Sequence, residues 1–289
     1  MATVTIIPHL EKEALPKILP DLIKFLKDRK VEVRLPKIEA EEMGVGEHGV
    51  EDSHLFESID FVIAMGGDGT ALRVARLLGS ETIPVFGLNL GKIGFLMQFE
   101  EVELYPSLER ILAGDYMTED RSKLKVEAEF VDGRKIKTFG LNEALIAGGE
   151  FNRIIELDVK INETFFSRYA LDGMIVATPT GSTAYSFSAG GPFVSPDTDI
   201  MIMTPICPHS LFNRTVILSA EDVLKIERAK EEKGKPIRLS IDGFAIEAGI
   251  SSVKISVSST KFRFIKHDET NFFSKLRTKL KDWDYFIRD

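Results

Sequence analysis

Length, composition and charge exclude several classes of protein. The chain has 289 residues, of which 44% are hydrophobic, so it is long enough for about two domains and needs no disulfide or metal to hold a core. Cys207 is the single cysteine, and the formal net charge of −8 argues against a nucleic-acid partner. Apolar stretches are too short for a membrane span, and no leader pattern opens the chain. We therefore expect no membrane partner and a cytoplasmic protein.

The first 116 residues alternate between strand and helix patterns. Short β-branched runs at 4–7 and 31–35 flank a helical pattern, and an apolar run at 61–65 leads through a glycine turn into another helix. Continuous apolar strands separated by helices are typical of a parallel sheet covered on both faces. We predict an α/β N-terminal domain with an open, mostly parallel sheet over residues 1–116, with a loop at 41–52.

From residue 117 the hydrophobic period changes to two. Alternating segments end at three pairs typical of tight turns: Asp132-Gly133, Asn162-Glu163 and Asp242-Gly243. This pattern predicts an all-β, sandwich-like C-terminal domain over residues 117–267.

A helical pattern follows in the last segment, 268–289, with Thr270 as its N-cap. One face of this helix is apolar, with Phe273, Leu276, Leu280 and Trp283. Because a lone helix must bury such a face, we expect it to return to the first domain, and a contact with another subunit is the alternative.

The turn Gly66-Gly67-Asp68-Gly69-Thr70 follows a strand and opens a helix, where α/β sheets bind ligands. Its glycines let a phosphate approach backbone N–H groups at a helix N-terminus. Beside a polyphosphate, the Asp68 carboxylate would contact Mg²⁺ or accept a proton from an attacking hydroxyl. The alternative is a tight turn in which Asp68 caps the helix.

A second polar run, 178–186, packs five aliphatic hydroxyls and a phenol into nine positions. Hydroxyls suit ribose and phosphate oxygens, and Tyr185 can cover a planar ring. A helix-capping turn is one alternative, and a nucleophilic Ser182 with His209 as its base is another. Asn142-Glu143 suits a ribose diol or an adenine edge, with a simple turn as its alternative.

Four segments taken together resemble the NAD kinase family: 66–70, 87–96, 141–143 and 172–192. The glycine turn alone is also similar to lipid kinases and phosphofructokinases, whereas the run 178–186 is far more specific. The resemblance implies phosphorylation of the 2′-hydroxyl of the adenosine ribose of NAD, which gives NADP. A lipid kinase of the diacylglycerol type and a non-catalytic NAD-binding regulator are the alternatives.

The resemblance also implies roles for single residues. Asp68 is the implied catalytic carboxylate. The residues implied to line the site or bind substrate are Gly69, Arg73, Phe95, Asn142, Glu143, Arg153, Asp172, Thr180, Thr183, Ala184, Tyr185, Ser186 and Ser188. No residue is assigned as a metal ligand, and no histidine has a Cys or His at zinc-ligand spacing.

Substrates and partners follow from the same resemblance. The implied substrates are NAD and either ATP or polyphosphate, with a divalent metal, Mg²⁺ by expectation. The implied pocket lies between the domains, and the implied assembly is a homodimer or homotetramer built by the β domain. The role of Asp242-Gly243 stays open.

Overall fold

The computed structural model describes most of the chain and divides it into two compact units. The described residues are 2–91, 94–148, 154–209, 213–229, 237–246, 249–267 and 272–286. The first unit comprises residues 1–120 together with 263–289, and the second comprises 121–262. The chain therefore leaves the first unit once and rejoins it near its C-terminal end.

The first unit alternates strands with helices. In chain order its elements are β1 (Thr3–Pro8), α1 (Leu15–Asp28), β2 (Glu32–Pro36), α2 (Lys37–Glu42), η1 (Gly46–His48), β3 (Gly49–Val50), η2 (Asp52–His54), β4 (Phe61–Gly66), α3 (Asp68–Leu78), β5 (Pro84–Asn89), η3 (Glu101–Glu103), α4 (Leu104–Leu112), β6 (Met117–Arg121), β19 (Phe262–Lys266) and α6 (Phe272–Phe286).

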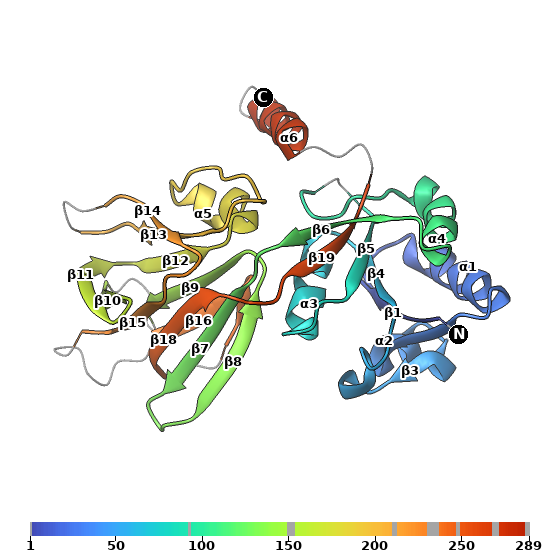
Figure 1. The fold of residues 1–289 in the computed structure, drawn as a ribbon, viewed down its shortest axis with the longest axis horizontal. Helices are drawn as coiled ribbons and strands as arrows, with labels where there is room; N and C mark the ends of the chain where they lie inside the picture. The colour runs from blue at the N-terminus through green and yellow to red at the C-terminus, as the bar shows by residue number, and fades with distance from the viewer. Residues whose placement is uncertain are drawn as a thin grey trace. The chain divides into compact units, whose positions relative to one another are not determined.

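A seven-stranded sheet forms the centre of the described part of this unit, in the order β3-β2-β1-β4-β5-β19-β6. β1 pairs in parallel with β2 and β4, and β5 pairs in parallel with β4 and β19. Every residue of β1 and β4 is buried, and buried leucines of α1 and α4 pack with alternate residues of these strands, so both helices cover one face. α3 lies on the other face (Figure 1). The prediction of an open, mostly parallel sheet is confirmed.

The second unit is built almost wholly of strands. In chain order its elements are β7 (Leu124–Phe130), β8 (Lys135–Gly140), β9 (Glu143–Gly148), β10 (Ile155–Ile161), β11 (Thr164–Leu171), β12 (Gly173–Ala177), η4 (Thr180–Thr183), α5 (Tyr185–Ser188), β13 (Ile200–Ile206), β14 (Val216–Ser219), β15 (Leu224–Arg228), β16 (Ile237–Ile241), β17 (Phe244–Ala245) and β18 (Ile250–Val257).

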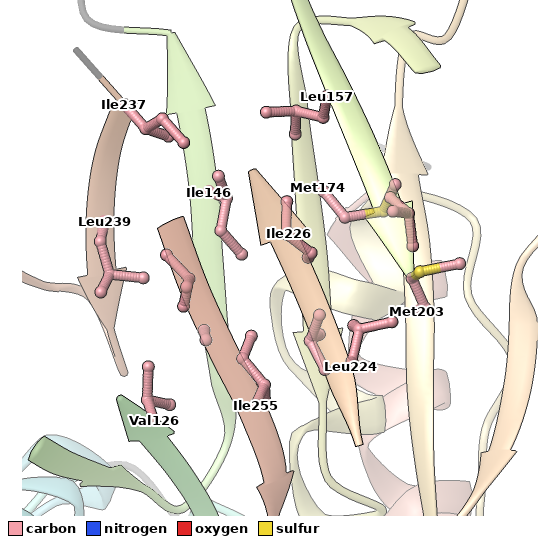
Figure 2. Close-up of a cluster of buried hydrophobic side chains, with 14 of the residues drawn as sticks. Val126, Ile146, Leu157, Met174, Met203, Leu224, Ile226, Ile237, Leu239 and Ile255 are labelled. Atoms are coloured by element: carbon pink, nitrogen blue, oxygen red, sulfur yellow. The ribbon is translucent and has the colours of Figure 1, made fainter. Parts of the chain in front are cut away.

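The strands of this unit pair antiparallel, and their inward side chains form one core. Figure 2 shows Ile146, Ile226, Met174 and Leu239, from four different strands, turned toward this shared interior. Tight two-residue turns join β10 to β11 at Asn162-Glu163 and β16 to β17 at Asp242-Gly243, both with positive φ. The prediction of an all-β second domain with these hairpins is confirmed.

Three segments differ from the sequence-based expectation. β6 and β19, at the two ends of the predicted β domain 117–267, lie in the sheet of the first unit. The apolar pattern of β19 fits either sheet, and β6 has a single apolar residue, so the period alone does not assign them. The loop predicted at 41–52 contains the end of α2, η1, β3 and the start of η2, because β3 pairs with β2 despite the local glycines.

The C-terminal helix is present as α6 and groups with the first unit. The predicted cap Thr270 lies outside the described residues. Of the predicted apolar face, Leu276 is buried, whereas Phe273 is 63% exposed and Leu280 is 37% exposed. The expected burial is therefore found for Leu276 alone among the described side chains of that face. No helix in the described part of the chain is long and apolar enough to cross a bilayer.

Candidate active site

The glycine turn joins the end of β4 to the start of α3. β4 ends at Gly66 and α3 begins at Asp68, with Gly67 between them in an extended conformation. A Cβ on Gly66 would lie 2.1 Å from the Thr70 hydroxyl oxygen, so glycine allows the helix to start tightly against the strand. Gly67 and the exposed Gly69 have open space around their Cα atoms. The first amides of α3, which have no partner within the helix, are therefore not covered by side chains of the turn.

The Asp68 carboxylate is held by a second loop of the same unit. Its Oδ2 accepts the N–H of Phe95 at 2.8 Å. Its Oδ1 accepts the N–H groups of Leu96 and Met97 at 3.0 and 3.3 Å. A Cβ on Gly94 would lie 2.1 to 2.3 Å from the carboxylate atoms. Only glycine at this position leaves room for the carboxylate.

The helix start excludes one of the two interpretations of Asp68. Gly67 occupies the N-cap position of α3, and no side-chain cap is formed there, so the N-cap interpretation is wrong. A carboxylate offers about four lone-pair positions, and three of them accept backbone N–H groups. One position on Oδ2 remains for a hydroxyl donor. Gly69 and Phe95, which are predicted to line the site, therefore lie with Asp68 within one unit.

Arg73, a predicted ligand residue, is engaged inside the protein. Its guanidinium pairs with the buried Glu39 carboxylate and lies 3.5 Å from the carbonyl of Pro8. An anionic ligand would have to compete with Glu39 for this group. The contact supports a structural role for Arg73 in fixing α3 against α2, and its role in substrate binding stays a prediction.

Buried polar atoms without partners collect around Gly66. Thr70 Oγ1, Asn89 Oδ1 and His9 Nδ1 have no hydrogen-bond partner among the described residues. Thr70 and the His9 side chain both flank Gly66, and Asn89 pairs with Gly66 across β4 and β5. Buried polar atoms are normally bonded, so these three atoms have hydrogen-bonding capacity left for a polar ligand or water.

A lysine lies beside this cluster. A Cβ on Gly91 would be 2.9 Å from Lys12 Nζ, so the ammonium rests on the backbone of the loop after β5. Lys12, Lys17 and Leu90 line a hollow of about 570 Å³, with Glu11, Glu13, Ala14, Ile18 and Glu101 on its other sides. The carboxyl edge of the sheet thus presents a cation, glycine backbone and unpartnered polar atoms together.

In the second unit, the polar run after β12 packs on the Asn142-Glu143 segment. The Thr178 N–H donates to the carbonyl of Asn142 at 2.8 Å, and its hydroxyl donates to the carbonyl of Leu141 at 2.6 Å. A Cβ on Gly181 would lie 2.1 Å from the same Asn142 carbonyl oxygen, so only glycine permits this contact. The two motifs, distant in sequence, therefore pack against each other.

Glu143 is the buried acid of this site. It is 8% exposed, and its Oε2 has no hydrogen-bond partner among the described residues. Burial, and secondly the nearby Asp242 carboxylate, raise the pKa of Glu143 to about 7, while a hydrogen bond from the Tyr185 N–H opposes this shift. Thr180 Oγ1 is also buried without a partner in the described chain. Both atoms fit a hydroxyl-bearing ligand.

The other predicted residues of the run separate into two groups. Tyr185 is 44% exposed, and Ser188 is exposed beside it, while Thr183 and Ala184 are half-buried. Ser186 is fully buried, and its hydroxyl lies 3.3 Å from that of Thr204 in the interior. Its hydroxyl is therefore turned to the core, away from the exposed surface of the run. Direct ligand binding by Ser186 is not supported by this geometry.

The Ser182 hydroxyl does not fit the role of a nucleophile. Ser182 is fully buried, its Oγ accepts the Val194 N–H at 3.1 Å and donates to the Val194 carbonyl at 3.2 Å. These bonds use the hydroxyl to fix the loop before β13. The hydrolase alternative has no support in this geometry.

Asp172 and Arg153 are the two remaining predicted residues. Asp172 is exposed and precedes β12, whereas the run 178–186 follows that strand. The five residues of β12, about 17 Å in extended length, lie between the points where Asp172 and the run join the strand. Arg153 lies outside the described residues. The roles of both stay predictions.

Some site residues were missed by the sequence analysis. His9 and Lys12 belong to no motif, and only their place after the first strand of a parallel sheet would have pointed to them. Asn89 lies in the glycine-rich loop already singled out. No group of three His, Cys, Asp or Glu side chains capable of holding a metal occurs among the described residues.

Two family models match this chain. Residues 4–116 match the ATP-NAD kinase N-terminal domain, and residues 141–267 match the ATP-NAD kinase C-terminal domain. A curated NAD kinase of Caldanaerobacter subterraneus subsp. tengcongensis is 38% identical over 283 residues, which are 98% of this chain and 100% of that protein. A curated NAD kinase of Moorella thermoacetica is 35% identical over 98% of this chain and 90% of that protein.

Solved structures share the fold. The crystal structure of yeast NADH kinase complexed with NADH superposes with a TM-score of 0.86 at 26% identity, over 95% of this chain and 86% of that one. An NAD kinase from Archaeoglobus fulgidus in complex with ATP gives a TM-score of 0.74 at 24% identity, over 97% of this chain and 99% of that one.

Proposed function

Because the chain belongs to the NAD kinase family, it phosphorylates NAD to NADP, and we propose that Asp68 is the carboxylate that accepts the proton of the attacking ribose hydroxyl. The observation that supports this role is the three-amide cradle around the Asp68 carboxylate, which leaves one lone pair of Oδ2 to face a hydroxyl. A carboxylate is too weak a base to ionise a sugar hydroxyl beforehand, so proton transfer is late and orientation carries much of the effect.

We propose that the second unit binds the dinucleotide. The packing of Thr178 and Gly181 on Asn142 fixes the backbone that carries the Asn142 and Glu143 side chains. Glu143 and Thr180 supply unpartnered oxygens for ribose hydroxyls, and the half-exposed Tyr185 ring supplies a flat surface for a base. The yeast NADH kinase relative, which is complexed with NADH, supports this assignment.

The donor is ATP or polyphosphate in this proposal, and its phosphates bind at the edge of the first sheet. The first amides of α3, Lys12 and the Thr70 hydroxyl offer the positive and hydrogen-bonding groups that phosphates need. Mg²⁺ enters with the donor as part of the substrate. Such an ion keeps several waters and needs few protein ligands.

The donor site predicts a specific defect for Lys12→Ala. The KM for the phosphate donor should rise about tenfold, while the KM for NAD changes little, because one charge-assisted contact to the donor is lost. Steady-state kinetics with each substrate varied in turn measure this. Lys24→Ala, an exposed lysine on α1, is the matched control and should leave both constants unchanged. An unaltered donor KM in Lys12→Ala would remove Lys12 from the site.

Glu143 predicts a pH dependence of NAD binding. Its pKa of about 7 means that the carboxylate ionises across neutral pH, and the ionised form is the better acceptor for ribose hydroxyls. NAD affinity should therefore rise with pH, by at most about tenfold per unit below the midpoint, and level off above it. Calorimetric titration with NAD, without a donor, measures this. Glu143→Gln should bind weakly with a flat profile, and a wild-type affinity that falls as pH rises would contradict the assignment.

One assay tests the function directly. The protein is incubated with NAD, Mg²⁺ and either ATP or polyphosphate, and NADP is measured. We expect NADP with at least one donor. Absence of NADP with both donors would overturn the kinase function. Phosphorylation of diacylglycerol in place of NAD would favour the lipid kinase alternative, and NAD binding without any turnover would favour the regulator.

We also propose that the protein is cytoplasmic and assembles as a homodimer or homotetramer. The exposed position of Asp172 leaves its carboxylate accessible to a second copy in such an assembly. Light scattering of the purified protein measures the assembly, and a monomer at assay concentration would contradict it.

A further inference from the structure

The turn Asp242-Gly243 has an unusual backbone and a buried acid. Both residues have positive φ, 51° and 79°, as a two-residue hairpin turn requires. Aspartate tolerates this conformation better than most residues with a side chain, yet it is commonly exposed in turns. Here Asp242 is only 6% exposed. The side chain therefore has a partner inside the protein.

That partner is the backbone that carries Asn142 and Glu143. Asp242 Oδ2 accepts the N–H of Leu141 at 2.7 Å. Asp242 Oδ1 accepts the N–H groups of Asn142 at 2.7 Å and Glu143 at 3.0 Å. In return the Asp242 N–H donates to the carbonyl of Glu143 at 2.9 Å. Three consecutive amides are thus bonded to one carboxylate.

The same segment is held from its other side. Thr178 bonds the carbonyls of Leu141 and Asn142, while Asp242 takes their N–H groups. The backbone at 141–143 is therefore fixed at both its donors and its acceptors. A backbone fixed in this way has little conformational freedom. It therefore limits the directions in which the Asn142 and Glu143 side chains can point.

We propose that Asp242 is a positioning residue for NAD: by binding three consecutive amides, it fixes the Asn142 and Glu143 side chains in the arrangement that binds the dinucleotide. This inference rests on the proposed binding role of the second unit. It assigns a function to a turn that the sequence analysis left open. Asp242 itself makes no contact with substrate in this assignment.

Asp242→Asn is the informative variant. Asparagine keeps the shape and tolerates positive φ, but its NH₂ group cannot accept an N–H. One amide of 141–143 then loses its acceptor and faces a donor. The Kd for NAD should rise about tenfold or more, as expected when a charge-assisted hydrogen bond is lost, and the KM for NAD should rise more than kcat falls.

Asp222→Asn is the matched control. Asp222 also accepts a backbone N–H in a turn, that of Ser219 at 2.8 Å, and binds the Asn162 amide at 2.7 Å. It has no contact with 141–143 among the bonds described here. Its substitution should leave NAD binding unchanged and lower the midpoint of thermal unfolding slightly.

A pH profile separates positioning from a general loss of stability. Among the described residues, the groups that act on the Glu143 carboxyl are the Asp242 carboxylate, from the β16–β17 turn, and the Tyr185 N–H, from α5. Removing the Asp242 charge lowers the pKa of Glu143. The midpoint of the NAD-binding profile should therefore move to lower pH in Asp242→Asn. A variant that is merely less stable would keep the wild-type midpoint.

Gly140→Ala provides a second variant. Its Cβ would lie 2.8 Å from Ile241 Cγ2 and 3.4 Å from Asp242 Oδ1, so it should press the turn away from the segment while both carboxylates remain. We expect weaker NAD binding, with the midpoint of its pH profile nearly unchanged because both carboxylates are still present.

The outcomes separate the inference from the function on which it rests. Wild-type protein that neither binds NAD nor makes NADP overturns both. An active wild type with unchanged NAD affinity in both Asp242→Asn and Gly140→Ala overturns the inference alone. Weaker binding in Asp242→Asn with the wild-type midpoint means a structural role only and also overturns it. Weaker binding with the midpoint moved to lower pH supports it.

Discussion

Asp68→Asn should lower kcat by about 10²- to 10⁴-fold while the KM for NAD changes little, as expected for the loss of a positioned proton acceptor. The asparagine still fits the cradle in shape, but an NH₂ group replaces one acceptor oxygen. The remaining lone pair on Oδ2, which we assign to the ribose hydroxyl, is lost in the orientation that keeps Oδ1 against Leu96 and Met97. Steady-state kinetics with saturating donor measure the change.

Asp60→Asn is the matched control for this variant. Asp60 Oδ2 accepts the Thr3 N–H at 2.8 Å, so it too is a carboxylate bonded to backbone in the first unit. It precedes β4, whereas Asp68 follows that strand, so it lies at the opposite end. Its substitution should cost some stability and leave kcat unchanged. Near-native kcat in Asp68→Asn, with NADP still formed, would remove Asp68 from the chemistry.

The repeating patterns of the sequence predicted most of the fold. The buried strands β1 and β4 were visible as continuous apolar runs because both faces of a parallel sheet are covered. The hairpin at Asp242-Gly243 is predictable because Asp-Gly is one of the few pairs that suit two positive φ angles in succession. Features that depend on local sequence were therefore predictable.

The features that the sequence did not predict depend on contacts between distant segments. β19 alternates as strands of the second unit do, and only its pairing with β5 assigns it to the first sheet. The bonds from Asp242 to Leu141 and Asn142 span 101 and 100 residues. A turn signal explains the Asp-Gly pair locally, so nothing in the sequence pattern pointed to this second use of the carboxylate.

In the candidate site, too, residue types were predictable from local sequence and contacts between segments were not. Glycines at 66, 67 and 69 and the hydroxyl run were singled out by residue type. The direction of each side chain was not predictable: Ser186 belongs to the run, but it faces Thr204 in the interior. Gly94 lies in the segment 87–96 that contributes to the resemblance, and its contact with Asp68 gives the reason for glycine there.

That contact gives the second large effect, in Gly94→Ala. The added Cβ would lie within 2.1 to 2.3 Å of the Asp68 carboxylate, so the carboxylate must move out of its cradle. It is the far end of a side chain and can move, so the fold should persist. The proton acceptor is then misplaced by about 1 Å or more, and kcat should fall about 10²-fold with little change in the KM for NAD.

The comparison of three variants decides whether Gly94 acts through Asp68. Gly46→Ala is the matched control, because its Cβ meets nothing within 4 Å and its φ is not in the left-handed region, so kcat should not change. If Gly94 acts only by placing Asp68, then adding Gly94→Ala to Asp68→Asn should cost little more than Asp68→Asn alone. If the two losses of kcat multiply in the double variant, the loop matters for a reason other than placing Asp68. If Gly94→Ala keeps native kcat, the carboxylate tolerates the displacement. Non-additive losses are the expected result, since a residue that only holds the carboxylate has nothing left to hold once its proton-accepting oxygen is gone.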